Sequence, residues 1–206
     1  MKLSIPAEQE SDAIQRQEGM LAERASRDRQ AFAILYDRYF NRIYNYLRFR
    51  CSDPETADDL AAQVFERALA NITSYRPDTA PFGAWLFAIA RNALNDHLRA
   101  QQRWSWLPID SLKRISGHGP GPEESVVTQE TQDELLSALE KLSQRERDLI
   151  ALKFAGGLNN RQIAGMSGLS ESNVGVILYR SLHRLREIMK GQAPGFEENE
   201  EQYGRP

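Results

Sequence analysis

One stretch of the chain combines polar, basic and aromatic side chains in a way suited to binding nucleic acid. The segment WLFAIARNALNDHLRAQQRWSW, from Trp85 to Trp106, has the period of an amphipathic helix, with Asn92 in line with Trp85 and several arginines on other faces. Arginines bind phosphate oxygens, and aromatic rings just before the helix, at Tyr75 and Phe82, can stack on unpaired bases. This chemistry is noncovalent. Each of these residue types also occurs in helices whose only role is to pack into a core.

A second stretch predicts a helix-turn-helix. In NNRQIAGMSGLSESNVGVILYRSLHRLREIM, Asn159 and Gln162 have capping-box spacing, a turn of small residues follows a short helix, and Ser170 caps a longer one. Such a second helix can enter a DNA major groove by its N-terminal end, and a plain helical hairpin is the structural alternative. The pattern turns Val174, Leu178, Ser181, Leu182, Leu185 and Met189 inward, and Ser172, Val176, Tyr179, Arg180, His183 and Arg184 outward.

No pattern typical of covalent catalysis or metal binding stands out. The sequence has no Walker-type glycine-rich phosphate loop and no evident Ser, His and Asp set. Cys51 is the single cysteine, and His97, His118 and His183 lie far apart. We therefore expect no disulfide within the chain, no metal, no cofactor and no enzyme activity.

Helices must position these side chains. An apolar stripe from Phe32 to Leu47 predicts one long helix, and SDPETADDLAAQVFERALANI predicts another, capped by Asp53 with Pro54 at its first position. Pro81 then starts the helix that contains Asn92. The second of these helices buries Ala57, Leu60, Ala61, Val64, Phe65, Ala68 and Ile72. Its outward residues, which form either a solvated face or a docking face, are Asp58, Asp59, Gln63, Glu66 and Arg67.

Breaks in the pattern divide the chain. LPIDSLKRISGHGPGPEESV is rich in Pro, Gly and Ser and reads as a linker. Beyond it, Ser143 and Glu146 form a capping box that starts a helix through Phe154, which stops at Gly156. The fold prediction is all-α, with two small helical domains joined by a flexible linker and a helix-turn-helix ending the second. The predicted segments are an N-terminal extension (1–27), a first domain (28–104), a linker (105–127), a second domain (128–190) and an acidic C-terminal tail (191–206).

Composition limits the class of protein. The chain has 206 residues with a net charge of −3 at pH 7, and 41% of its residues are hydrophobic. No apolar run approaches the roughly 20 residues that span a bilayer, and the start lacks the apolar stretch of a secretory signal. We expect a cytoplasmic protein without membrane insertion. Because its net charge is negative, any DNA binding must be local or assisted by a partner.

Five blocks in order resemble one family. AFAILYDRYFNRIYNYL, ADDLAAQVFERAL, WLFAIARNALNDHLR, ALEKLSQRERDLIALKFAGGLNNRQIA and GLSESNVGVILYRSLHRLRE are similar to successive blocks of the extracytoplasmic-function (ECF) group of bacterial sigma factors. The resemblance covers about residues 32 to 190. It implies an RNA polymerase sigma factor that binds core polymerase, directs initiation at a subset of promoters and assists promoter melting.

The resemblance also implies partners and sites. The implied partners are core polymerase, through its β′ clamp and β flap, and promoter DNA. Many relatives are also held inactive by an anti-sigma factor, whereas others are controlled by terminal extensions or by expression alone, so an anti-sigma factor is one of the alternatives for this chain. The outward face with Asp58, Asp59, Gln63, Glu66 and Arg67 would dock on the β′ clamp. The loop from about Thr73 to Pro81 and the helix after it would meet the single-stranded minus-ten element, and the last helix would read the minus-thirty-five element as duplex. The resulting candidate DNA contacts are Tyr75, Arg76, Arg91, Asn92, Arg99, Arg103, Ser172, Asn173, Tyr179, Arg180, His183 and Arg184.

Two departures from the family pattern affect these assignments. Many relatives carry Gln where this chain has Ala62, and in the last helix Gly175, Val176 and Ile177 replace basic and polar residues that are often found there. The promoter sequence therefore does not follow by analogy. A free-standing helix-turn-helix regulator, whose first domain senses a ligand or dimerises, is the alternative reading. Such a regulator does not need both an acidic docking helix and a helix that bears Asn and Arg behind an aromatic loop. The first domain therefore distinguishes the two readings.

Overall fold

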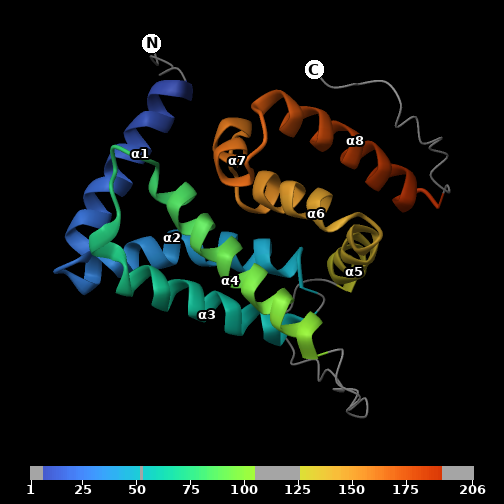
Figure 1. Ribbon diagram of the computed structural model, residues 1–206, viewed down its shortest axis with the longest axis horizontal. Helices are drawn as coiled ribbons and strands as arrows, with labels where there is room; N and C mark the ends of the chain where they lie inside the picture. Colours follow the sequence, from blue (N-terminus) through green and yellow to red (C-terminus); the bar gives the residue numbers. More distant parts are fainter. Residues whose placement is uncertain (1–6, 52, 105–125, 192–206) are drawn as a thin grey trace.

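The described part of the chain consists of helices joined by turns and loops. The computed structural model describes residues 7–51, 53–104 and 126–191, and over these ranges it contains helices and turns but no strand. Figure 1 shows two helical units, one running from α1 (Ala7–Ala25) to α4 (Phe82–Trp104) and the other from α5 (Val126–Glu140) to α8 (Glu171–Met189). The predicted all-α class is confirmed.

Aspartate side chains cap the starts of two helices in the first unit, of which the cap at Asp53 is predicted from the sequence. α2 (Arg29–Arg48) follows Asp28, whose carboxylate accepts a hydrogen bond from the Gln30 N–H at 2.9 Å. α3 (Pro54–Ala70) follows Asp53, which accepts one from the Thr56 N–H at 2.9 Å. A short 3-10 turn, η1 (Ile72–Ser74), leads into the loop before α4. The core between these helices includes Leu35, Ile43 and Leu47 of α2, Leu60 and Val64 of α3, and Leu86, Phe87 and Leu94 of α4.

The first unit also contains a helix that the sequence pattern does not predict. Residues 1–27 read as an extension, whereas α1 occupies most of that segment and packs on α2 with Leu21 and Ala22 buried. Glu18 of α1 is buried as well, and its carboxylate accepts hydrogen bonds from Arg38 at 3.1 Å and from the Tyr39 hydroxyl at 2.9 Å. The buried face of α1 combines Leu21 and small residues with the charged Glu18, so its apolar content is low and its packing is decided by its partners.

The second unit ends in the predicted helix-turn-helix. α6 (Gln144–Ile150) starts at the capping box of Ser143 and Glu146, and it continues into a π-helical turn, η2 (Ala151–Ala155), where the sequence predicts an unbroken helix. α7 (Asn160–Ser167) and α8 are separated by Gly168, whose φ of 72° lies in the left-handed region. Ser170 caps α8 by accepting a hydrogen bond from the Asn173 N–H at 3.2 Å.

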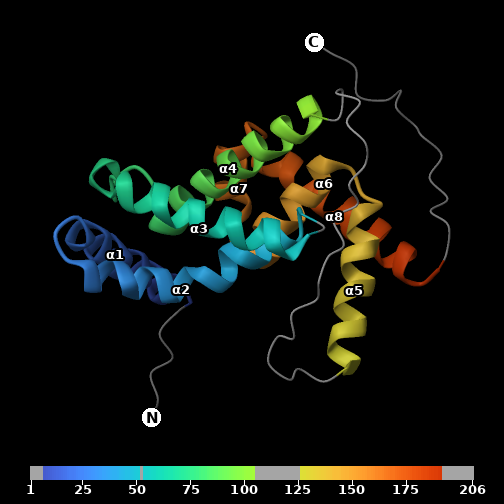
Figure 2. The ribbon, with the colours of Figure 1, turned by 90° about the horizontal axis from the view of Figure 1, so that it is seen from below.

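The two units pack against each other. Figures 1 and 2 both place α7 beside α4, and η2 contacts α2. The predicted linker (105–127) lies outside the described residues except at its end, because α5 already begins at Val126. Gly191 apart, the predicted acidic tail lies outside them too. The sequence predicts the two units but not the contact between them.

The buried carboxylate of Glu18 makes the role of α1 testable. Glu18→Ala leaves the Tyr39 hydroxyl and the half-buried Arg38 without their acceptor, so we expect it to lower the free energy of unfolding by about 1–3 kcal/mol. Urea unfolding followed by circular dichroism measures the change. Gln17→Ala, at an exposed position on the same helix, serves as the control and should change stability by less than about 0.5 kcal/mol. Equal stability of the two variants would show that α1 is not an integral part of the first unit.

Candidate functional site

The outer face of α3 is polar and exposed. Its inner face buries Ala57, Leu60, Ala61 and Val64, while the polar residues on its other side are exposed, as predicted. Arg67 forms an ion pair with Asp96 of α4 at 3.6 Å, but both side chains are about half exposed, so this pair stabilises the fold little. The exposed set contains all the residues predicted for polymerase docking, namely Asp58, Asp59, Gln63, Glu66 and Arg67.

The negative charge of this face extends to its border with α2. Partial burial is the main cause that raises the pKa of the Tyr44 hydroxyl, and the carboxylate of Asp58 raises it further. The phenol therefore stays neutral and can donate a hydrogen bond beside an acidic surface. Such a surface suits a partner that presents basic side chains.

The exposed face of α4 carries three of the predicted nucleic-acid contacts. Asn92, Arg99 and Arg103 are exposed and follow one another at intervals of seven and four residues, which places them along one side of the helix. Arg99 lies 3.9 Å from the carboxylate of Asp96, a weak and exposed pair that a phosphate can replace. This side of α4 can therefore follow a nucleic-acid backbone.

Arg91 is not on this side, which corrects its predicted availability. Its Nε donates to Oδ2 of Asp148 in α6 at 2.8 Å, and its Nη1 donates to the Met166 carbonyl in α7 at 2.9 Å. Both partners belong to the second unit. In this arrangement Nε and Nη1 of Arg91 serve the contact between the units, and the side chain is only 28% exposed, so fewer of its donors face solvent than the sequence suggests.

Asp148 is the centre of that contact. Its side chain is 10% exposed, its Oδ1 accepts a hydrogen bond from the Tyr46 hydroxyl at 2.9 Å, and Oδ1 also lies 3.6 Å from Nε of Arg50. Arg50 in turn donates to the Gln144 carbonyl at 2.7 Å. Burial and the adjacent Asp148 charge raise the pKa of Tyr46 well above its ordinary value, so the phenol stays protonated as a donor.

Backbone carbonyls of the second unit complete the contact. Arg42 of α2 donates to the carbonyl of Gly156, just after η2, and its guanidinium lies 4.7 Å from the ring centroid of Tyr39. The first unit therefore contributes the cationic side of the interface and the second unit the acceptors. This division of charge holds α6, η2 and α7 in place.

The loop before α4 is built differently from the prediction. Tyr75 is buried, its ring packs edge-on against Phe82 and 5.3 Å from Trp85, and its hydroxyl donates to the Ala80 carbonyl at 3.0 Å. Burial raises the pKa of Tyr75 to about 12. Neither Tyr75 nor Phe82 is available to stack on a base, because their rings fix the loop from inside. The exposed residues of the loop include Arg76, Pro77, Asp78 and Thr79.

The predicted recognition helix exposes most of its predicted contacts. Ser172, Asn173, Tyr179, Arg180 and His183 are exposed, and Tyr179 is 73% exposed. Arg184 is partly covered and lies 3.7 Å from the carboxylate of Glu146, so it acts within the unit. Leu182 and Met189 were predicted to pack inward, but they are 39% and 37% exposed, because the core under α8 is filled by Val174, Leu178, Ser181 and Leu185.

No group of His, Cys, Asp and Glu in the described residues could hold a metal ion. No helix in the described part of the chain is long and apolar enough to cross a membrane.

Comparisons with known proteins agree with the division into units. The family models for sigma-70 region 2 and sigma-70 region 4 match residues 35–104 and 132–185. The chain is 30% identical over 174 residues to the ECF RNA polymerase sigma factor BldN of Streptomyces coelicolor, covering 84% of this chain and 66% of that protein. It is 27% identical over 155 residues to SigM of Bacillus subtilis, an ECF RNA polymerase sigma factor, covering 75% of this chain and 92% of that protein.

Solved structures share the fold. CnrH in complex with the cytosolic domain of CnrY aligns with a TM-score of 0.64 at 24% identity, over 85% of this chain and 99% of that one. The sigma factor RpoE in complex with the anti-sigma factor NepR, from Bartonella quintana, aligns with a TM-score of 0.63 at 23% identity, over 77% of this chain and 96% of that one.

The contact at Asp148 predicts a coupled change in stability and shape. Asp148→Ala removes the counter-charge of Arg91 and Arg50, so we expect a loss of about 2–3 kcal/mol in the free energy of unfolding, moderated by the partial exposure of Arg91. Small-angle X-ray scattering should show a larger radius of gyration. Asp133→Ala, at an exposed site on α5, is the control. An unchanged radius together with unchanged stability would contradict the assigned role of Asp148.

Proposed function

Because this chain belongs to the ECF group of RNA polymerase sigma factors, we propose that its two units divide promoter recognition between them. The first unit, residues 7–104, binds core polymerase and the minus-ten element. The second, residues 126–190, binds the minus-thirty-five element and the β flap. The observation that carries the proposal is the order of the two sigma-70 matches, each of which falls on one helical unit with an exposed candidate surface.

The polymerase contact is assigned to the outer face of α3. Asp58, Asp59, Gln63, Glu66 and Arg67 are exposed on one side of a helix whose other side is packed, so they can meet the β′ clamp without disturbing the fold. Ala62 is exposed on the same helix, and its methyl group offers a partner no charge or hydrogen bond. The contact therefore depends on the charged residues around it.

Promoter DNA is assigned to two surfaces that act on different forms of DNA. Asn92, Arg99 and Arg103 of α4, with Arg76 of the preceding loop, meet the unpaired strand of the minus-ten element. α8 enters the major groove of the minus-thirty-five element by its N-terminal end. The contacts along α8 are Ser172, Asn173, Tyr179, Arg180 and His183, with the partly exposed Arg184 beside them. Tyr75 supports the loop before α4 from within the fold.

Arg91 links DNA binding to the contact between the units. It can turn its Nε and Nη1 donors to a phosphate only after they leave Asp148 and the Met166 carbonyl. Full engagement of Arg91 by promoter DNA therefore competes with the contact between α4 and α6. No such competition applies to the α3 face or the start of α8, which are exposed in the packed arrangement.

The chain acts in the cytoplasm as an initiation factor without covalent chemistry of its own. Two of the similar structures are complexes, one of them with an anti-sigma factor, and we include an anti-sigma factor among the partners of this chain. The free-standing regulator is not favoured, since both sigma-70 regions are matched. Co-purification with core polymerase, followed by promoter-dependent transcription in vitro, tests the proposal directly.

Charge reversal tests the polymerase contact. Replacing both Asp58 and Asp59 by Lys should weaken association with core polymerase by about 2 kcal/mol, roughly 30-fold, because like charges would then meet at the interface. The folding cost should be only about 1 kcal/mol, from the loss of acids near the N-terminus of α3. Competition binding to core polymerase measures the effect. The same double reversal at Asp133 and Glu134, which are exposed on α5, controls for net charge. Equal competition by the two folded variants would reject the α3 assignment.

Two substitutions separate the DNA surfaces. Arg180→Ala removes a contact to duplex DNA, and Asn92→Ala removes one to unpaired bases, each worth about 1–3 kcal/mol. Arg180→Ala should reduce recruitment to closed duplex, whereas Asn92→Ala should allow closed complexes and block open ones. Footprinting and permanganate reactivity on matched duplex and pre-melted templates distinguish these outcomes. Arg186→Ala, at another exposed arginine of α8, is the control. The same defect for both variants on every template would contradict the division of labour.

A further inference from the structure

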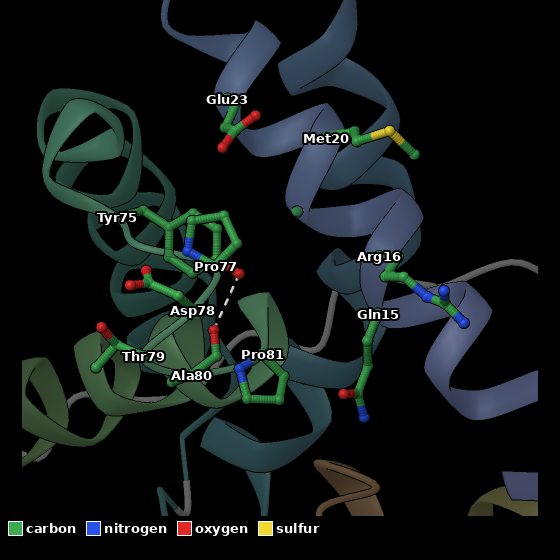
Figure 3. Close-up of a pocket in the computed structure, with 11 residues that line it drawn as sticks. Gln15, Arg16, Met20, Glu23, Tyr75, Pro77, Asp78, Thr79, Ala80 and Pro81 are labelled. Atoms are coloured by element: carbon green, nitrogen blue, oxygen red, sulfur yellow. Dashed lines mark hydrogen bonds between the residues drawn. The ribbon is translucent and has the colours of Figure 1, made fainter. Parts of the chain in front are cut away.

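Cavities in this protein differ in size and in the charges that line them. Figure 3 shows a large one, a groove of about 740 Å³ with α1 on one side and the loop of Tyr75 to Pro81 on the other. Its lining includes Arg16 as well as the acids Glu23 and Asp78, so charges of both signs are present. A much smaller cavity, of about 30 Å³, lies where α5 and α6 meet the end of α2, and the charges around it are mainly positive.

Side chains from both units line the small cavity. The first unit contributes residues 48–51 at the end of α2, and the second contributes Leu136 and Glu140 of α5 and Arg147 of α6. Arg50 also donates to the Gln144 carbonyl at 2.7 Å, so the units are in direct contact at this point. The cavity therefore exists only while the two units are packed together.

Two guanidinium groups at this cavity have buried nitrogen atoms without acceptors. The Nε atoms of Arg50 and Arg147 are both buried, and neither has a hydrogen-bond partner within the described residues. The side chain of Arg50 is only 4% exposed, and its Nε lies 3.6 Å from Oδ1 of Asp148, which is an ion pair without a hydrogen bond. A buried N–H group that lacks an acceptor costs free energy, so an acceptor placed here would stabilise the contact.

Negative charge near these arginines falls short of the positive charge. Asp148 already faces both Arg50 and Arg91. No described residue forms an ion pair with Arg147, and Glu140, the acid that acts on it, is exposed, so water screens its charge. Burial and then the charge of Arg50 lower the pKa of Arg147, as expected for a cation with too little counter-charge.

The thiol of Cys51 does not supply the missing charge. Cys51 lines the cavity and is buried, and burial raises the pKa of its thiol, so the group stays neutral. A neutral thiol can donate a weak hydrogen bond to an anion beside it. The position of Cys51 is therefore compatible with an added anion.

We propose that one small inorganic anion, of the size and charge of chloride, binds in this cavity between Arg50 and Arg147. A water molecule takes up about 30 Å³ in the liquid, so the cavity admits a single ion of about that size and excludes organic anions such as gluconate. The anion accepts hydrogen bonds from the two Nε–H groups and supplies negative charge. Because the walls come from both units, it binds the packed arrangement and stabilises it relative to separated units.

The anion site does not depend on which surfaces bind DNA and polymerase. It makes the packing of the two units respond to the anion of the medium. Where promoter DNA engages Arg91 fully, it competes with the same packing, so chloride and DNA act on the contact in opposite directions.

Urea unfolding of the complete protein tests for anion binding. Potassium chloride replaces potassium gluconate at fixed ionic strength, so that only the anion changes, and circular dichroism follows unfolding. Broadening of the chlorine NMR line measures the dissociation constant independently. If chloride binds only the packed form, chloride at about ten times its dissociation constant should raise the folding equilibrium constant about tenfold.

Two arginines of α6 provide the variant and its control. Arg147→Gln removes a charge that lines the cavity, so it should abolish the difference in stability between chloride and gluconate. Arg145→Gln removes the same charge at an exposed position of the same helix and should keep that difference. A halide series on the unmodified protein needs no variant, and a site of this size should favour chloride or bromide over the larger iodide.

Three results would overturn the proposal. Equal stability in chloride and gluconate, without line broadening, would mean that the cavity holds only water. The same chloride dependence in Arg147→Gln and Arg145→Gln would assign the effect to a general action of salt on the protein. A steady trend in stability from fluoride through iodide, with no optimum at chloride or bromide, would lead to the same conclusion even if Arg147→Gln does not fold.

Discussion

The buried carboxylate of Asp148 holds the two units of this protein together. It faces the Tyr46 hydroxyl, Arg50 and Arg91, all from the first unit. A carboxylate out of contact with water is tolerated only where opposite charges and hydrogen-bond donors replace its hydration. Because Asp148 lies in α6, this one contact also sets the place of η2, α7 and the recognition helix relative to α2 and α4. The packed arrangement is therefore electrostatic at its centre, with apolar packing inside each unit.

An interface of this kind is suited to exchange. A guanidinium binds a carboxylate and a phosphate by the same donors, so DNA can compete with Asp148 for Arg91 without any change in the side chain's chemistry. The two proposed surfaces that need no such exchange, the outer face of α3 and the N-terminal half of α8, remain exposed in the packed arrangement. Binding to polymerase can therefore precede the separation of the units, and separation can be driven by contacts that form afterwards.

The first unit depends on a second buried carboxylate. Glu18 links α1 to Tyr39, and Tyr39 packs against Phe82 at the start of α4. Tyr75, which the sequence offered as a ring for stacking on bases, belongs to the same cluster. Its ring shapes the loop instead of binding DNA. The residues left to read bases in this region are exposed loop residues and Asn92, which act at the surface of a loop that the buried aromatic rings keep rigid.

Local signals in the sequence determined the all-α class, most helix starts, the helix-turn-helix and the exposed face of α3. They could do so because caps at Asp53, Ser143 and Ser170 and a helical period of apolar residues act within a few residues of one another. Only the tertiary structure decided the places of α1, Arg91 and Tyr75. Each of these depends on a partner 20 or more residues away or on a ring packed from another element, and an arginine that binds a carboxylate has the same sequence signal as one that binds a phosphate.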